Sequence, residues 1–516
     1  MRLYLKYFSI HLRSAMQYKT SFFLTVLGQL LVSFSMFLGI YFMFSRFHTV
    51  EGFSYQEVLL CFAIVLMAFS LAECFARGFD AFPSMLGNGQ FDRILVRPRG
   101  AVFQVLACLQ LLVAAGTEAT IAIPLAFLGL TVLMWLYYAA LRATRCVGFE
   151  METIAFFLST LSLSITASSA QSSLFKQFLA ILLGLALFLV LGLFLRDLSR
   201  VQKNRWLMAA AAIGLLGITL VIGNSKYGAV NWISIGGMSF QPSEIAKICY
   251  IFAGAATLER LFHKRNLTLF IVLTGVCIGL LGLMSDFGTA AIFFVTFLVI
   301  AYMRSGDFAT LSLICGGAVF GAGIILKFKP YILSRFASWG HAWEAASTTG
   351  YQQTRTMSAA ASGGLLGMGA GNGWLHNVAA ADTDLVFGML CEEWGLIIAL
   401  LAVLSILTLA VFAVRACRAG RSSFYVIAAC AATSMMVFQT CLNVFGAVDI
   451  LPLTGVTFPF VSNGGTAMIA SWGLLAFLKA TDTRQNASFA IRLPSRREDR
   501  RGAALAPKST DEWEAD

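Results

Sequence analysis

Long apolar runs alternate with short polar connections along most of this chain. The runs approach or exceed the length of about 20 residues that a helix needs to cross a membrane. A helix satisfies its own backbone hydrogen bonds, which lipid cannot do, so the runs predict membrane-spanning helices. The predicted fold is all-α, a polytopic membrane protein with a ten-helix bundle after about four extra N-terminal helices. The extra runs lie near 21–46, 56–76, 102–117 and 120–141, and the ten spans near 152–170, 176–196, 204–222, 244–262, 267–285, 287–304, 308–327, 384–414, 424–447 and 462–481.

Positive charges between the runs predict the orientation of the helices. Cytoplasmic loops of membrane proteins carry an excess of Lys and Arg. With the N-terminus in the cytoplasm, alternation places the basic loops at 196–205, 260–265 and 415–421 inside the cell. The chain is therefore expected to be a multi-pass protein of the cytoplasmic membrane. The segments left on the outer side are 223–243, 328–383 and 448–461.

Composition agrees with a membrane location and argues against a nucleic-acid partner. Hydrophobic residues make up 58% of the chain and charged residues 12%, a balance unsuited to a water-soluble protein. The net charge of +11 is carried by short clusters between apolar runs, so membrane topology accounts for it. The eleven cysteines lie almost all in apolar runs without a CxxC pair, which predicts neither a disulfide framework nor a metal site.

The chain is expected to consist of four parts, with the N-terminal boundaries implied by the two family resemblances given with their motifs below. Residues 1–117 form an N-terminal membrane segment, and 118–150 an extra helix with its linker. Residues 151–484 hold the ten-span bundle with a large outer loop at 328–383, which is too long for a simple connection. Residues 485–516 are polar and highly charged, as expected of a disordered cytoplasmic tail.

Asp384 stands where the large outer loop meets the span at 384–414. Asp and Thr are favoured at helix N-termini, so Thr383 and Asp384 can be interpreted as a helix cap. Asp382 could cap the helix equally well, which would leave Asp384 available as a general base. The residues alone leave both interpretations open.

Other charged residues lie at helix ends or at membrane depth, where charge is costly. Glu392 and Glu393 fall about two turns into the 384–414 span. They must face the bundle interior or water, which favours a polar network. Glu244 and Lys247 are three residues apart on one helix face and can pair, although Lys247 could instead help to hold a pyrophosphate.

Turn-forming residues gather at two further places near the outer surface. Asp286 and Gly288 interrupt an apolar run, which predicts a tight turn between two spans. The stretch 451–465 is rich in Gly and Pro. It predicts non-helical backbone at membrane depth, which is tolerated only where it lines a cavity in the protein.

The segment from about 152 to 484 resembles the SEDS family of cell-shape, division and sporulation proteins, which includes FtsW, RodA and SpoVE. Each matching motif is short, but the motifs occur together and in order across all ten spans. They are Gly228-Ala229 with Trp232, Gln241-Pro242-Ser243-Glu244 with Lys247, Asp286 with Gly288-Thr289-Ala290, Gly350-Tyr351-Gln352, Gly363-Gly364, Thr383-Asp384, Glu392-Glu393 with Gly395, Asn443, Pro452 with Thr454-Gly455, and Pro459 through Gly465.

This resemblance implies a bacterial peptidoglycan glycosyltransferase that joins lipid II units on the outer face of the membrane. Such enzymes usually act beside a class B penicillin-binding protein that crosslinks the strands. In this family the catalytic acidic residue is the Asp of the Thr-Asp motif, here Asp384. Its carboxylate would act as the general base and take the proton from the attacking sugar hydroxyl. Arg335, Lys247 or a divalent cation, Mg²⁺ or Mn²⁺, would neutralise the departing undecaprenyl pyrophosphate.

The same resemblance assigns roles to the residues expected around Asp384. Those expected to bind substrate are Arg335, Lys247, Glu244, Gln352, Thr383 and Ser462. Those expected to build a polar network are Asp286, Glu392, Glu393, Trp232 and Asn443.

Four places depart from the common pattern of the family. Ser285 replaces the usual Pro, Leu385 the usual Phe, Asn463 the usual Tyr, and the run 379–382 a Pro-Glu stretch. These changes spare the carboxylate of Asp384, so they bear on substrate contacts rather than on the class of reaction.

The first 100 or so residues instead resemble the start of an ABC-2-type exporter permease, through their two apolar spans and the polar stretch 89–98. There is no Walker motif, and too few spans remain before the bundle for a whole permease. A truncated remnant or fused gene start is expected, so deletion of residues 1–100 should leave polymerisation intact.

Two other functions suit the same architecture. A lipid II flippase would use Gly- and Pro-broken helices without bond chemistry, and a non-catalytic scaffold would only regulate its penicillin-binding partner. Both should tolerate Asp384→Asn, whereas a polymerase should lose nearly all turnover.

Overall fold

The computed structural model describes residues 99–116, 120–143, 148–226, 229–235, 238–258, 264–305, 312, 315–316, 339–418 and 422–482. All of them belong to one compact unit, Leu95–Asp516. The predicted spans at 21–46 and 56–76, almost all of the span at 308–327, Arg335 and the C-terminal tail lie outside the described residues.

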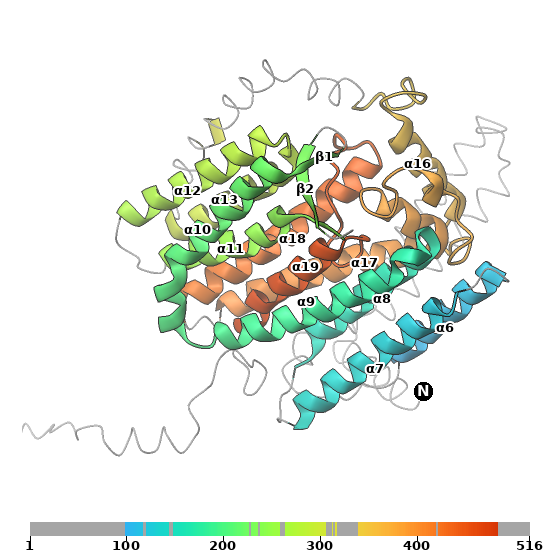
Figure 1. The fold of residues 1–516 in the computed structure, drawn as a ribbon, viewed down its shortest axis with the longest axis horizontal. Coiled ribbons are helices and arrows are strands. Elements are labelled where there is room, and N and C mark those ends of the chain that lie inside the picture. The colour runs from blue at the N-terminus through green and yellow to red at the C-terminus, as the bar shows by residue number, and fades with distance from the viewer. Residues whose placement is uncertain are drawn as a thin grey trace, which may run out of the picture. The chain divides into compact units, whose positions relative to one another are not determined.

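Long helices form the described part of the chain, as the apolar runs predict (Figure 1). Within the described residues, six helical segments are long and apolar enough to cross a membrane, and four more are shorter apolar helices. Nine of the ten predicted bundle spans coincide with a helix, with ends displaced by at most six residues. The helices are α6 (Arg99–Ala115), α7 (Ala122–Ala143), α8 (Glu150–Ser169), α9 (Leu174–Phe194), α10 (Leu198–Ile222), α11 (Pro242–Leu258), α12 (Lys264–Leu283), α13 (Phe287–Ser305), α16 (Tyr351–Gly363), α17 (Val386–Arg418), α18 (Ser423–Ala447) and α19 (Gly465–Ala480), with 3-10 turns η3 (Gln171–Ser173) and η4 (Leu375–Asn377).

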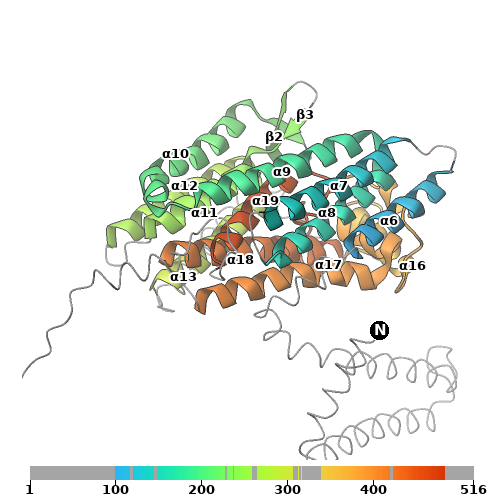
Figure 2. The same ribbon diagram turned by 90° about the horizontal axis from the view of Figure 1, so that it is seen from below.

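Helix α19 lies in the interior of the bundle, in contact with α8, α9, α11, α17 and α18 (Figures 1 and 2). Its Trp472 is fully buried. The ring of Trp472 meets Phe156 and Phe188 edge-on at centroid distances of 5.2 and 5.8 Å, a favourable geometry for aromatic pairs. A Cβ on Gly184 of α9 would lie 2.8 Å from the Trp472 ring, so a residue without a side chain is needed for α9 and α19 to pack this closely.

The helices α6 and α7 are joined to α8 by buried polar contacts. Gln104 of α6 donates to Thr160 Oγ1 of α8 at 3.2 Å and accepts from Thr131 Oγ1 of α7 at 2.7 Å. The Tyr137 hydroxyl of α7 donates to Glu152 of α8 at 3.0 Å. Sequence divides these helices from the bundle at residue 151, whereas the structure packs them into the same compact unit.

Glu152 also holds the inner end of the bundle through a buried ion pair. Lys479 Nζ of α19 lies 3.0 Å from Glu152 Oε1 and donates to the Gly148 carbonyl as well. Removing either charge would strand the other in a nonpolar interior. The ion pair therefore ties the first and last spans of the ten-helix bundle together.

A small antiparallel sheet occupies the outer segment between α10 and α11, which the all-α prediction did not include. Its strands are β1 (Asn224–Lys226), β2 (Ala229–Ile235) and β3 (Met238–Phe240), in the order β1-β2-β3. Trp232 lies on β2 opposite Asn224. The Val230 N–H of β2 donates to the Met284 carbonyl at 3.0 Å, which fixes the sheet over the turn between α12 and α13.

Candidate functional site

Asp384 lies in a tight turn just before α17. The helix begins at Val386, two residues later than predicted. The Ala380 carbonyl accepts hydrogen bonds from the N–H groups of Thr383 and Asp384 at 3.3 and 2.9 Å. Ala380 has a φ of 59°, a left-handed conformation that costs an L-residue free energy. The turn is therefore defined by its own backbone.

Two buried side chains from other elements hold this turn in place. Asn443 of α18 donates through Nδ2 to the backbone carbonyls of Asp384 at 2.9 Å and Val456 at 2.8 Å. The Ser462 hydroxyl donates to the Thr383 carbonyl at 2.6 Å and accepts from the Phe458 N–H. The two side chains thus bond the peptide carbonyls before and after the Asp384 Cα, which holds the backbone from which the Asp384 side chain extends.

Glycines give the Asp384 carboxylate its room. A Cβ on Gly455, whose φ is 69°, would lie 3.2 Å from Asp384 Oδ2. A Cβ on Gly288, at the start of α13, would lie 2.6 Å from Val456. The loop 451–464 can therefore come close both to α13 and to the carboxylate only because these two positions are glycine.

Two of the family departures contact each other in this structure. Asn463 Nδ2 donates to Asp382 Oδ2 at 2.7 Å, and the Asn463 N–H donates to the Asp382 carbonyl at 2.8 Å. Ser169, at the outer end of α8, adds a second hydrogen bond to the Asp382 carboxylate at 3.2 Å. Asp382 thus helps to fix the turn, and Asp384 is the carboxylate that lies beside Gly455 of the loop 451–464.

Lys247 and Glu244 form a buried ion pair below the loop 451–464. Lys247 is 1% exposed, and its Nζ lies 2.7 Å from Glu244 Oε1 and 3.1 Å from Gln439 Oε1. Gln439 in turn donates to the carbonyl and hydroxyl of Thr457, both at 2.9 Å. The geometry supports a positioning role for the pair, and substrate binding by Lys247 and Glu244 stays a prediction.

Sequence reasoning missed Gln439 and Thr457, which connect this ion pair to the loop 451–464. Gln439 lies in an apolar stretch of α18 and is buried. A polar amide side chain inside a membrane helix is costly unless it has hydrogen-bond partners. The presence of Gln439 in an apolar stretch was therefore the only signal available in the sequence.

Glu392 and Glu393 face the protein interior, as predicted from their depth. The Glu392 carboxylate accepts from the N–H groups of Trp374 and Leu375 at 2.8 and 3.0 Å. The Glu393 carboxylate accepts from the Gly371 N–H at 3.2 Å. The two side chains therefore bind backbone, and they hold residues 371–375 of the outer segment against α17.

The remaining predicted residues lie around the rim of the site. Gln352 of α16 donates to the Ala379 carbonyl at 2.9 Å, which joins α16 to the turn before Asp384. Asp286 follows the turn residues 284–285, and its carboxylate accepts from the Thr289 N–H and from Asn231 of β2; its role in a polar network of the site stays a prediction. Arg355, three residues after Gln352, is an exposed guanidinium that sequence reasoning did not single out; it stacks on Tyr351 at 5.2 Å.

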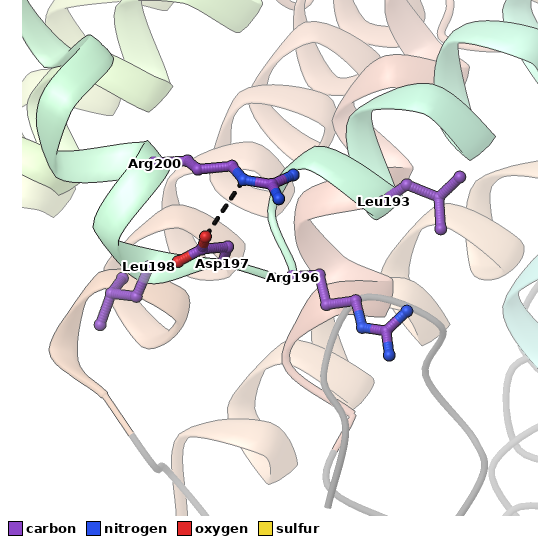
Figure 3. A pocket seen from close by; sticks show the side chains of 5 residues that line it. All are labelled: Leu193, Arg196, Asp197, Leu198 and Arg200. Carbon is purple, nitrogen blue, oxygen red and sulfur yellow. Dashed lines mark ion pairs between the residues drawn. The ribbon is translucent and has the colours of Figure 1, made fainter.

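A surface pocket of about 490 Å³ lies at the opposite end of the bundle, in the connection between α9 and α10 (Figure 3). Leu193, Arg196, Asp197, Leu198 and Arg200 line it. Asp197 caps α10 and pairs with Arg200 at 3.1 Å, while the Arg196 side chain points away from that pair (Figure 3). Hydrogen bonding from Ser199 lowers the pKa of the exposed Asp197 carboxyl. This basic, exposed connection fits the cytoplasmic side predicted for it.

The donor set for a metal is limited. Within the ranges that the structure covers, there is no group of three or more His, Cys, Asp and Glu side chains that could hold an ion. The residues near Asp384 therefore do not fit a metal held by the protein alone.

Comparison with known proteins identifies two similarities. The model of the FtsW, RodA and SpoVE family, described as cell cycle protein, matches residues 149–487. That of an ABC-2 family transporter protein matches residues 30–194, which agrees with the resemblance of the N-terminus and extends it through α6 to α9.

Individual relatives agree with the first match. The peptidoglycan glycosyltransferase RodA of Mycobacterium bovis is 27% identical over 324 residues, which are 59% of this chain and 69% of that protein. The probable peptidoglycan glycosyltransferase FtsW of Buchnera aphidicola is 30% identical over 294 residues, 54% of this chain and 73% of that protein. A solved structure reported as "Structural coordination of polymerization and crosslinking by a peptidoglycan synthase complex" superposes with a TM-score of 0.54 and 25% identity, over 64% of this chain and 96% of the other. This chain belongs to the FtsW, RodA and SpoVE family of multi-pass membrane proteins.

Proposed function

We propose that this protein is a peptidoglycan glycosyltransferase that polymerises lipid II on the outer face of the cytoplasmic membrane, with Asp384 as its general base. The observation that carries the proposal is the fixation of the Thr383–Asp384 turn. Two separate elements bond its backbone, α18 through Asn443 and the loop 451–464 through Ser462 and Asn463, and Gly455 leaves space beside the carboxylate. A group that must meet a reacting atom benefits from such preorganisation.

The chemistry requires a base at this position. A sugar hydroxyl attacks the anomeric carbon of a second lipid-linked sugar, and a new C–O bond forms as the bond to the pyrophosphate breaks. The pyrophosphate leaves with the electron pair, and the hydroxyl proton passes to the Asp384 carboxylate. A positioned carboxylate of this kind contributes roughly 10²- to 10⁴-fold to a rate.

Positive charge for the departing pyrophosphate is proposed to come from arginine. Lys247 is buried and bonded to Glu244 and Gln439, which favours a positioning role for it. Arg355 is exposed on α16, three residues from Gln352, and Arg335 precedes the described outer segment. Arginine can bind phosphate oxygens with two parallel hydrogen bonds. Mg²⁺ or Mn²⁺ would have to be held largely by the pyrophosphate itself, so no step is assigned to a metal.

The partner proposed for this enzyme is a class B penicillin-binding protein. The similar solved structure concerns a synthase complex that coordinates polymerization and crosslinking. A glycan strand made at Asp384 emerges at the outer surface, where a crosslinking enzyme in the same membrane could act on it.

The test is polymerisation of lipid II by the purified chain, with and without that partner, followed by gel analysis of glycan ladders. Wild-type protein should give ladders, and Asp384→Asn should lose at least about 100-fold in rate with an unchanged thermal transition. Asp382→Asn is the matched control, because its amide oxygen can still accept from Asn463 and Ser169, and it should retain most of the turnover.

Ladders from Asp384→Asn at the wild-type rate would overturn the assignment of the base. Absence of ladders from every variant, with partner present, would favour a lipid II flippase or a scaffold.

A further inference from the structure

The outer segment between α16 and α17 descends along α17 and returns. At its upper end, Gln352 of α16 bonds the Ala379 carbonyl, close to Asp384. At its lower end, the residues after α16 bond the backbone of α17 around Gly395. Residues 364–369 form the turning point of this path, which we call the re-entrant tip.

The re-entrant tip pairs with a break in α17. Gly395 has φ 80° and ψ 164°, which interrupts the helix. The N–H groups of Met368 and Gly369 donate to the carbonyls of Glu392 and Glu393 at 2.8 and 3.0 Å. The N–H groups of Leu396 and Ile397 donate to the carbonyls of Gly364 and Leu365 at 3.0 and 3.3 Å. Backbone groups freed by the break are thus satisfied by protein, the condition for irregular backbone at membrane depth.

Two hydrogen bonds along helix α8 indicate how far the tip lies from the outer end of that helix. Its outer end, Ser169, bonds Asp382 beside the site. Five residues earlier, Ser164 accepts a hydrogen bond from the indole N–H of Trp394, the residue before the break, at 3.0 Å. Five helical residues correspond to about 7 Å along the axis. Because α8 is long and apolar enough to cross a membrane, the Trp394 side chain, beside the break to which the tip is bonded, lies about one and a half turns inward from the outer end of α8.

The surface of the tip is apolar and continues the lipid-facing side of α17. Leu365, Leu366 and Met368 are 64%, 82% and 46% exposed. The residues from Gly363 to Gly371 include no polar side chain. Next to them, Leu396, Ile397, Leu400 and Leu401 are exposed on α17, a spanning helix whose exposed face must contact lipid.

We propose that the re-entrant tip lies among the acyl chains of the outer leaflet, with Leu365, Leu366 and Met368 in contact with lipid. Three observations support this inference: pairing of the tip with a spanning helix, its depth below the end of α8, and its continuity with the apolar face of α17. The inference concerns membrane contact alone and does not depend on glycosyl transfer.

Residues 339–349 of the same outer segment provide an internal control. The N–H groups of Gly340 and Ala342 donate to the Asp449 carboxylate at 3.2 Å each. Asp449 follows the outer end of α18. This stretch is therefore held at the outer end of α18, where we expect water rather than acyl chains, although it belongs to the same loop in the sequence.

Photolabelling of the full chain in lipid nanodiscs tests the proposal. The bilayer would be phosphatidylcholine with a diazirine near the end of one acyl chain, and adducts would be mapped by mass spectrometry. We expect adducts on residues 365–368 about as abundant as those on 396–404, and about tenfold above those on 339–349. Adducts on the tip no more abundant than those on 339–349 would overturn the proposal.

A pair of variants and a second probe make the test independent of one labelling reaction. Leu366→Lys should reduce tip adducts about tenfold relative to Leu366→Met, because charge is costly in hydrocarbon, while adducts on α17 stay unchanged. Equal labelling of the two variants would contradict the proposal. In the unmodified protein, hydroxyl radicals from water should oxidise His341 and spare Met368, and oxidation of Met368 as fast as His341 would also overturn it.

Discussion

At the scale of single residues, Gly455 gives the most direct test of the space beside Asp384. An added methyl group would lie 3.2 Å from the carboxylate and would also require an L-residue at φ 69°. We expect Gly455→Ala to lower polymerisation by at least about tenfold through displacement of the carboxylate. The measurement is the initial rate of glycan synthesis together with the thermal transition.

Gly340 is a control for the backbone effect of that substitution. Its φ of 74° is similar, but an added Cβ would meet nothing within 4 Å. Both alanine variants should therefore lose about 1–2 kcal/mol of stability, and only Gly455→Ala should lose activity. Equal activity loss in the two variants would show that crowding of Asp384 is not the cause.

The buried Lys247–Glu244 pair makes a second prediction at this scale. Lys247→Met removes the cation from a carboxylate that is 5% exposed, so the protein should lose about 3–5 kcal/mol of unfolding free energy. The double variant Lys247→Met/Glu244→Leu removes both charges and should regain much of that stability. The measurement is chemical or thermal unfolding in a lipid-like detergent.

The activity of the same double variant separates positioning from phosphate binding. If Lys247 acts through Gln439 and Thr457, the double variant should keep part of its turnover with a nearly unchanged KM for lipid II. If Lys247 neutralises pyrophosphate directly, the double variant should be as inactive as Lys247→Met despite its recovered stability. That second result would return the residue to the clamp role expected from sequence.

Individual contacts show why part of the site could not be predicted. The carboxylate of Asp384 and its helix junction follow from the Thr-Asp motif and the onset of an apolar run. The bond between Asp382 and Asn463 joins residues 81 positions apart, and each one departs from the family pattern alone. No local rule connects them, because their proximity depends on how α8, α17 and the loop 451–464 pack together.

At the scale of elements, the spans were predictable because lipid imposes a length and an apolar composition on every helix. The β1-β2-β3 sheet was not, since its strands have only three to seven residues and lie in a segment rich in Gly and Ser. The break at Gly395 was not predictable either, because the apolar pattern of α17 continues through it and the backbone that satisfies the break, at 364–369, is distant in the sequence.

That break provides the prediction for this scale. A Cβ on Gly395 would lie 2.3 Å from the Leu365 carbonyl oxygen and 2.4 Å from the carbonyl carbon of Leu366. Gly395→Ala should therefore separate the re-entrant tip from α17, increase hydrogen exchange at 368–369 and 396–397, and reduce polymerisation. Gly279→Ala in α12 is the control, because no atom lies within 4 Å of its added Cβ and alanine favours a helix by about 1 kcal/mol. Unchanged exchange in Gly395→Ala would contradict this account of the break.

At the scale of the whole molecule, the ABC-2-like similarity does not end where the bundle begins. It covers residues 30–194 and overlaps the family match at 149–487. The helices α6 and α7 lie in the part of the ABC-2-like match that precedes this overlap, and they bond α8, which lies within it, through Gln104 and Tyr137. Phe103 of α6 also meets Trp394 of α17 at a centroid distance of 5.4 Å. A boundary at residue 151 is therefore a boundary of sequence similarity, and the packed unit is larger.

Two truncations distinguish these boundaries. Deletion of residues 1–98 stops before α6 and removes two predicted spans, so the orientation of later helices is preserved; polymerisation and the thermal transition should stay close to wild type. Deletion of residues 1–143 also preserves orientation. It removes Gln104, the hydrogen-bond partner of Thr160, and Tyr137, a hydrogen-bond partner of Glu152. Because buried polar groups without partners cost about 1–3 kcal/mol each, the longer deletion should lower the transition temperature and the yield of inserted protein. Equal stability of the two truncations would mean that α6 and α7 merely lie against the bundle, whereas inactivity of the shorter one would assign a role in polymerisation to the first 98 residues.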